Sequence, residues 1–286
     1  MISDITLGQF FPGSSPLHRL DPRSKILLSL LYIVAIFVAN TVIAFVTLIF
    51  VTVLLMAISG ISFGVMLRGI KPIVFILVFT SLLNLFLTTG EGEPLLSFYF
   101  IKIYEEGIVR AVFMTLRVIV LIIGSSLLLT YTTSPIALTD GIEGLLSPLK
   151  KIKLPVHAFA MMMSIALRFI PTLIEETEKI MNAQRSRGAD FTSGGLIKRA
   201  RSLIPLLVPL FMSSFKRADE LATAMECRCY RGDKNRTKLV KLEYKPLDFL
   251  WLGLFALLLG AMIFSRYLPD LTAGMGLIFD IAFYQI

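Results

Sequence analysis

Long apolar segments separated by short polar breaks dominate the first half of the chain and return near its end. About 20 apolar residues are needed to cross a bilayer as a helix, so each such run predicts a membrane span. The expected spans are residues 26–39, 42–59, 73–87, 108–131 and 247–264, with 271–283 as either a last crossing or an interfacial segment. The pattern predicts an all-α integral membrane protein with five or six transmembrane helices.

Two further segments, 155–187 and 196–231, begin apolar and end charged. Both contain few helix-breaking residues, and at the helical rise per residue each would extend roughly 45–50 Å. Pro171, Pro205 and Pro209 lie in their apolar halves and should kink the helices, because proline removes a backbone hydrogen bond. We therefore expect two long, kinked helices that start against the bilayer and finish in water.

Composition supports a membrane protein. The 286 residues are 56% hydrophobic and 17% charged, with a mean hydropathy of +0.79. Soluble domains are about 45–50% apolar and about 25% charged. The first apolar run begins only after Lys25, which predicts an uncleaved first helix rather than a cleavable signal peptide. The only cysteines, Cys227 and Cys229, lie in a basic stretch, and we expect both thiols to be reduced.

Charge predicts the orientation and the division of the chain. Residues 141–246 hold 19 Lys and Arg against 10 Asp and Glu, so the excess positive charge of the protein lies in this block. Short cytoplasmic segments carry such an excess, which places the amino terminus and the two long helices in the cytosol of a multi-pass cell-membrane protein. Nucleic acid is not an expected partner, because aromatic stacking motifs are missing. The expected regions are 1–135 (amino-terminal spans), 136–246 (coupling helices) and 247–286 (carboxy-terminal spans).

Each long segment ends in an arginine-centred tripeptide. Ser186-Arg187-Gly188 resembles an ordinary helix cap, since glycine favours the position after a helix and a cation there is stabilised by the helix dipole. Cys227-Arg228-Cys229 repeats the arrangement at the end of the second segment. A zinc site at the two cysteines is the competing interpretation, but residues two apart on a helix point to nearly opposite faces and the chain has no further cysteine. We expect no metal site.

The chain resembles the transmembrane T component of energy-coupling factor transporters over nearly its whole length. The similarity rests on four stretches: 11–25 (FPGSSPLHRLDPRSK), 168–171 (RFIP), 183–188 (AQRSRG) and 222–230 (ATAMECRCY). Both arginine motifs of the family typically read Ala-Arg-Gly. Here Ser186 replaces the first alanine, and Cys227 and Cys229 replace the alanine and glycine of the second motif. A cysteine in place of glycine suggests that the second helix need not end in a left-handed cap.

The resemblance implies a coupling subunit with no catalytic residues and no cofactor of its own. In this family the two long helices cross, and their arginine ends dock into two ABC-type ATPases, which bind ATP and Mg²⁺. The apolar faces of the helices hold one membrane-embedded substrate-binding protein, the S component. The implied docking residues are Ser186, Arg187, Gly188, Cys227, Arg228 and Cys229. The implied S-component surface comprises Met161, Met162, Met163, Leu206, Leu207, Leu210 and Phe211.

Two other functional classes compete with this interpretation. An enzyme is disfavoured, because the sequence contains no phosphate-binding loop, His-Glu-x-x-His pair or nucleophile elbow. A self-contained permease or channel is the main alternative. Arg110 and Arg117 are charged residues in the fourth span, and an intramembrane charge is by default a functional candidate. Near a helix end, however, arginine usually extends its charged group to the membrane surface.

Overall fold

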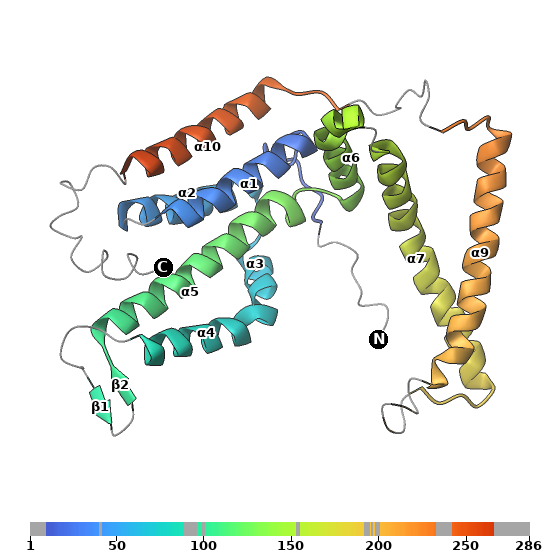
Figure 1. The fold of residues 1–286 in the computed structure, drawn as a ribbon, viewed down its shortest axis with the longest axis horizontal. Helices are drawn as coiled ribbons and strands as arrows, with labels where there is room; N and C mark the ends of the chain where they lie inside the picture. The colour runs from blue at the N-terminus through green and yellow to red at the C-terminus, as the bar shows by residue number, and fades with distance from the viewer. Residues whose placement is uncertain are drawn as a thin grey trace. The chain divides into compact units, whose positions relative to one another are not determined.

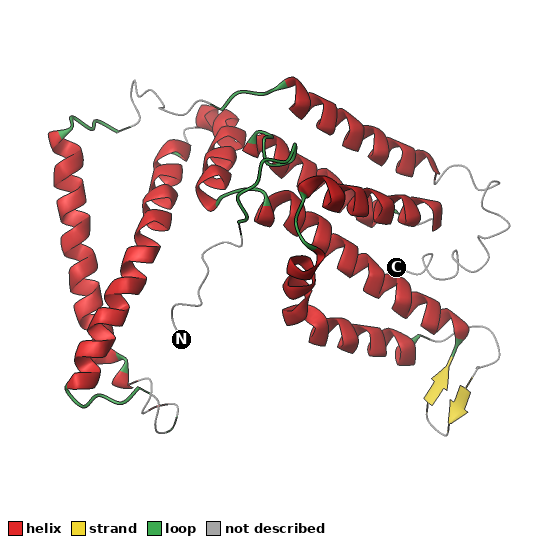
Figure 2. Cartoon of the chain, turned by 180° about the vertical axis from the view of Figure 1, so that it is seen from behind, coloured by secondary structure: helices red, strands yellow, loops and turns green. Residues whose placement is uncertain are grey.

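The computed structural model describes residues 10–39, 42–88, 96–98, 101–152, 155–191, 195, 197, 201–232 and 242–265. Most of these residues are helical, which confirms the all-α prediction. The helices are α1 (Pro22–Val38), α2 (Val42–Ser59), α3 (Phe63–Ile70), η1 (Lys71–Ile73), α4 (Val74–Leu87), α5 (Glu105–Ser125), η2 (Ser126–Tyr131), α6 (Pro135–Leu146), η3 (Ser147–Ile152), α7 (Val156–Ser186), α9 (Ile204–Cys227) and α10 (Pro246–Ser265) (Figure 1). A short antiparallel hairpin of β1 (Leu96–Phe98) and β2 (Ile101–Ile103), not predicted from the sequence, precedes α5 (Figure 2).

The described chain divides into two units. One holds residues 142–232, with α7 and α9, and the other holds residues 10–141 together with 242–265. In the second unit α1 packs against α10 and α5, and α4 packs against α5. The division brings the amino-terminal helices and α10 together although more than a hundred residues separate them along the chain.

Tyr32 lies at the centre of the second unit. Its side chain is fully buried, and its hydroxyl lies 2.7 Å from Thr52 Oγ1 and donates to the Val120 carbonyl at 3.0 Å, so it joins α1, α2 and α5. Gly124 of α5 faces the same ring, and a β-carbon there would come within 2.2 Å of it. The close approach of α1 to α5 therefore depends on glycine at this position.

Within the described residues, four helical stretches are long and apolar enough to cross a membrane: Phe63–Leu87, Gly107–Tyr131, Val156–Ser186 and Pro246–Phe264. A shorter apolar helix covers Ile43–Ser59. These stretches fit an all-α membrane protein. The segment 271–283 lies outside the described residues, and the number of five or six spans stays a prediction.

The boundaries of the two long helices agree with the sequence in one case and differ in the other. Helix α7 lies within one residue of the predicted 155–187 at each end, and Pro171 lies inside it. The second prediction, 196–231, is interrupted in the structure: Ile197, Arg201 and Ser202 are helical, Leu203 forms a turn, and α9 then covers Ile204–Cys227. Pro205 occupies the first turn of α9, where its missing N–H removes no hydrogen bond within this helix. The predicted proline kinks stay a prediction. Pro209 is inside the helix, as predicted.

Candidate coupling site

The first arginine motif closes α7 with a left-handed turn. Arg187 is the C-cap residue, and Gly188 follows with a φ of +86°. The Gly188 amide donates to the Arg185 carbonyl at 2.9 Å, and the Ala189 amide donates to the Gln184 carbonyl at 3.0 Å. These two bonds form a Schellman motif, which satisfies carbonyls that the end of a helix leaves free. The turn leaves Arg187 exposed at the tip of the helix.

The second motif has the same backbone geometry. Arg228 is the C-cap of α9, the Cys229 amide donates to the Glu226 carbonyl at 2.8 Å, and the Tyr230 amide donates to the Met225 carbonyl at 3.0 Å. Cys229 has a φ of +58°, so the second helix does end in a left-handed cap although the sequence suggested that it need not. The two Schellman bonds hold this residue in the conformation that glycine adopts in the first motif. Arg228, Cys227 and Cys229 are all exposed.

Helices α7 and α9 cross in antiparallel directions (Figures 1 and 2). Glu176 of α7 contacts Arg217 of α9, and further along α7 Gln184 donates to the carbonyl of Pro205, which lies nearer the start of α9. Glu176 also accepts a hydrogen bond from Ser213, so the helices lie against each other from the Glu176–Ser213 contact to the Gln184–Pro205 contact. The predicted crossing of the long helices is thus present in the structure.

The crossing places the two capping arginines on opposite sides rather than together. Arg187 follows Glu176 by 11 residues, and Arg228 follows Ser213, the residue of α9 opposite Glu176, by 15 residues. Arg187 therefore lies about 16 Å along α7 from this contact, and Arg228 lies about 22 Å along α9 from it. Because the helices are antiparallel, these two arms point away from each other.

Apolar side chains face outward along both long helices. Met162 and Met163 on α7 are exposed, as are Leu207 and Phe211 on α9, with Phe211 65% exposed. Met161 and Leu210 are half-buried. Leu206 was predicted as part of this surface but is only 6% exposed, so it does not contribute to it. The 3.6-residue helical period explains the difference, since neighbouring residues on α9 point in different directions.

The amino-terminal segment that carries part of the family resemblance is fixed by a buried carboxylate the sequence analysis did not identify. Asp248 accepts hydrogen bonds from the Asp21 amide at 2.9 Å and from the Lys245 amide at 2.7 Å. Asp21 itself caps α1 by accepting from the Arg23 amide. Lys25 donates to the Thr132 carbonyl at 2.7 Å. Together these bonds tie the start of α1 to the start of α10 and the end of η2.

Arg117, one of the two charges on which the permease alternative depended, has a structural role. It is buried, and its Nη2 donates to the carbonyl of Ala39 at 2.9 Å. Ala39 is the C-cap of α1, where a cation is stabilised by the helix dipole. The guanidinium therefore holds the end of α1 against α5.

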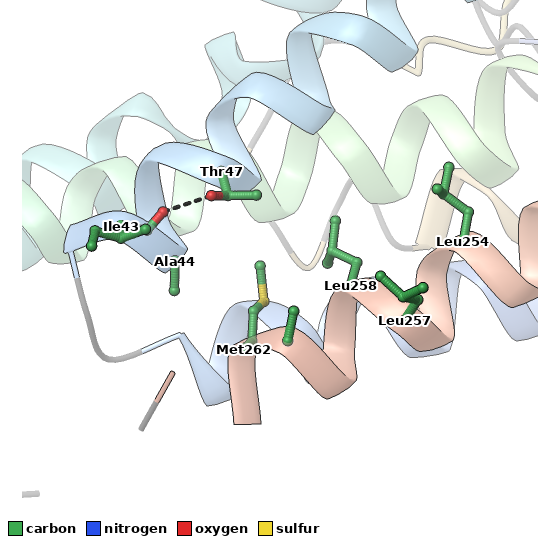
Figure 3. Close-up of a pocket in the computed structure, with 8 residues that line it drawn as sticks. Ile43, Ala44, Thr47, Leu254, Leu257, Leu258 and Met262 are labelled. Carbon is green, nitrogen blue, oxygen red and sulfur yellow. Dashed lines mark hydrogen bonds between the residues drawn. The ribbon is translucent and has the colours of Figure 1, made fainter. Parts of the chain in front are cut away.

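A pocket of about 300 Å³ lies between α2 and α10 (Figure 3), and its lining is mostly apolar. Its polar lining side chain is Thr47, whose hydroxyl donates to the carbonyl of Ile43 in its own helix at 2.7 Å. The other lining residues are Ile43, Ala44, Leu254, Leu257, Leu258, Ala261 and Met262. An apolar lining of this kind suits contact with hydrocarbon rather than recognition of a hydrophilic substrate.

Comparison with known proteins places these features in a family. Residues 13–239 match the cobalt transport protein family CbiQ. The energy-coupling factor transporter transmembrane protein EcfT of Clostridium kluyveri is 53% identical over 250 residues, which cover 87% of this chain and 92% of the relative. EcfT of Ruminiclostridium cellulolyticum is 51% identical over 267 residues, 93% of this chain and 99% of the relative. EcfT of Bacillus subtilis is 49% identical over 248 residues, with 87% and 93% covered.

Proposed function

The chain belongs to the CbiQ cobalt transport protein family, and we propose from this premise that it is the transmembrane T component of an energy-coupling factor importer. It would transmit ATP-driven motion of two ABC-type ATPases to a membrane-embedded S component that binds a micronutrient such as a vitamin or a metal ion. ATP and Mg²⁺ would bind to the ATPases, and this chain would need no cofactor. The relatives named EcfT support this assignment.

The matching geometry of the two arginine caps carries the proposal. Both place an exposed arginine at the C-cap, followed by a left-handed residue and the same pair of Schellman bonds. A guanidinium is always charged and presents a planar fork of donors, which can bind a carboxylate through two parallel bonds. Two equivalent caps on opposite sides of the crossing would give each ATPase its own docking point.

The outward apolar faces of α7 and α9 supply the proposed S-component surface. Exposed methionines adapt to partners of different shape, because the side chain is unbranched and polarizable. A contiguous apolar surface on a coupling helix also favours a membrane-embedded partner over a soluble one. We place Met162, Met163, Leu207 and Phe211 in this contact, with the arginine caps and the amino terminus on the cytoplasmic side.

Alanine substitution of the two arginines tests the docking role. In a complex co-expressed with both ATPases and the S component, Arg187→Ala and Arg228→Ala should each weaken ATPase binding by about 2–5 kcal/mol, because each leaves a buried partner charge unpaired. The measurement is recovery of each ATPase when this chain is pulled down. The double variant should recover neither ATPase and should lose transport-coupled ATP hydrolysis.

Matched controls lie close to each cap. Arg185→Ala and Arg231→Ala remove exposed arginines next to the motifs without changing the capping position. Both should retain the ATPases. Full recovery of both ATPases with the double variant would refute docking through these arginines. Substrate uptake by this chain reconstituted alone would instead support the permease alternative.

A further inference from the structure

One carboxylate makes two of the polar contacts between α7 and α9 that the described residues show. Glu176 of α7 accepts a hydrogen bond from Ser213 Oγ on one oxygen and from Arg217 Nη2 on the other. Ser213 and Arg217 are four residues apart and therefore lie on the same face of α9, one turn apart. Both members of the ion pair are partly buried, with 22% of the Glu176 side chain and 31% of the Arg217 side chain exposed.

A second polar contact follows from proline chemistry. Pro209 has no N–H, so the carbonyl of Pro205 lacks its usual partner within α9. Gln184 of α7 donates to this carbonyl at 3.4 Å. Gln184 lies eight residues beyond Glu176, or about 12 Å along α7. The long distance makes this the weaker of the two contacts, so most of the directional restraint at the crossing comes from Glu176.

Directional contacts matter here because side-chain packing between two helices allows several crossing angles, and hydrogen bonds of fixed geometry select among them. The carboxylate must reach both Ser213 and Arg217, and a rotation or a shift of α9 by a turn would break both bonds. The helix segments between the crossing and the arginines amplify a small rotation. If a helix rotates by about 10° at the crossing, an arginine that lies about 16 Å from the crossing moves by about 3 Å. Such a displacement exceeds the tolerance of a bidentate hydrogen-bonded pair.

We infer that Glu176 is a positioning residue that fixes the angle between α7 and α9 and hence the separation of the two arginine caps. This inference rests on the proposed function for its consequence in transport. The crossing angle itself can be measured on the isolated chain, without either ATPase. Failure of the positioning role and failure of the proposed function are therefore distinguishable.

The angle is measured by pulsed electron paramagnetic resonance in lipid nanodiscs. One spin label is attached to Cys227 in a Cys229→Gly chain, and the other to an introduced Asn182→Cys on the exposed end of α7. We expect a narrow distance distribution with Glu176 intact and a broad or shifted one in Glu176→Ala. The exchanged pair, Glu176→Arg with Arg217→Glu, should restore the narrow distribution. Glu175→Gln, at the exposed neighbouring carboxylate, is the control and should leave the distribution unchanged.

Transport is measured in the reconstituted complex with native cysteines. Substrate transported per ATP hydrolysed should fall about ten-fold in Glu176→Ala and Arg217→Gln, the population change expected from losing one charge-assisted hydrogen bond. Recovery of the ATPases should remain, because both caps are intact, and the exchanged pair should regain most of the coupling. A distance distribution that is unchanged in Glu176→Ala overturns the positioning role. A changed distribution with unchanged coupling overturns its importance for transport, and a native chain that binds no ATPase overturns the proposed function instead.

Discussion

A cysteine in the left-handed region carries a steric cost that glycine avoids, and Cys229 carries this cost at the end of α9. Its β-carbon lies near the following carbonyl, yet the Schellman bonds of Cys229 and Tyr230 keep the conformation. Local hydrogen bonding thus outweighs the preference of the side chain. The shape that presents Arg228 is retained although the residue type changes.

Replacing this cysteine with glycine should stabilise the second cap. We expect Cys229→Gly to strengthen it by about 1 kcal/mol, which slows local opening about five-fold. Hydrogen exchange of the peptide containing the Tyr230 amide measures the effect. Gly188→Cys should have the opposite effect on the first cap, and Cys227→Ser, which changes a thiol without a left-handed backbone, should change neither. Equal exchange in Cys229→Gly and the native chain would contradict a strained cap.

Among single residues, the sequence predicts the role of those that act within their own helix. It does not predict the role of those whose partners lie far away along the chain. Arg187 and Arg228 are recognisable because each ends a helix that the residues just before it predict. Asp248 binds the Asp21 amide 227 residues away, and Glu176 binds Arg217 41 residues away. A single sequence gives the periodicity of each helix but not the register between two helices. The contacts that hold the site together therefore appear only in the structure.

The long helices combine two surfaces that should be separable by mutation. Each has exposed apolar residues in its first half and an arginine cap at its end. Met162 lies 25 residues before Arg187, or roughly 37 Å along α7. A change at one surface should leave the other in place.

A charge on the apolar face should release the S component alone. Met162→Glu buries a carboxylate in the proposed contact and should reduce S-component recovery at least ten-fold, while both ATPases remain bound. Pull-down of the co-expressed complex measures both. Ala222→Glu, an exposed position on the charged half of α9, should retain all partners. Loss of the ATPases together with the S component would show that the two surfaces are not independent.

The helix boundaries show how accurately the hydrophobic pattern predicts where each helix begins and ends. Val42–Ser59 was predicted to the residue, because apolar residues fill it and Gly60, with a φ of +69°, ends it. The predicted helix 196–231 missed the turn at Leu203, because the residues on both sides of it are helical and continue one pattern. Proline at a helix start and proline inside a helix are also hard to distinguish by sequence. Only the structure shows that Pro205 belongs to the first class and Pro209 to the second.

For the molecule as a whole, the charge distribution predicts which end of each span faces the cytosol. The exposed thiols of Cys227 and Cys229 are suited to test it. In intact cells a membrane-impermeant maleimide should not label them. In inverted vesicles stripped of the ATPases it should, and rebinding the ATPases should slow the labelling because both thiols flank Arg228.

A cysteine on the opposite side gives the control. Glu105, at the start of α5, is exposed and belongs to the acidic loop expected outside the cell. Glu105→Cys, in a chain with Cys227→Ser and Cys229→Ser, should be labelled in intact cells. Labelling of the native cysteines in sealed cells would reverse the orientation and remove the proposed cytosolic contact with the ATPases.

The two helix ends beyond the Glu176–Ser213 contact differ in length, because Arg187 lies 11 residues from Glu176 and Arg228 lies 15 residues from Ser213. A half-turn about this contact would exchange the directions of α7 and α9 but would not bring Arg187 onto Arg228. Dimeric assemblies most often have two-fold symmetry, so this single chain would present different geometry to the two halves of such a pair. The residues flanking the arginines add a second difference, with Ser186 and Gly188 on one side and Cys227 and Cys229 on the other. In the proposed complex, any preference for which ATPase binds which helix end would have to come from these two differences.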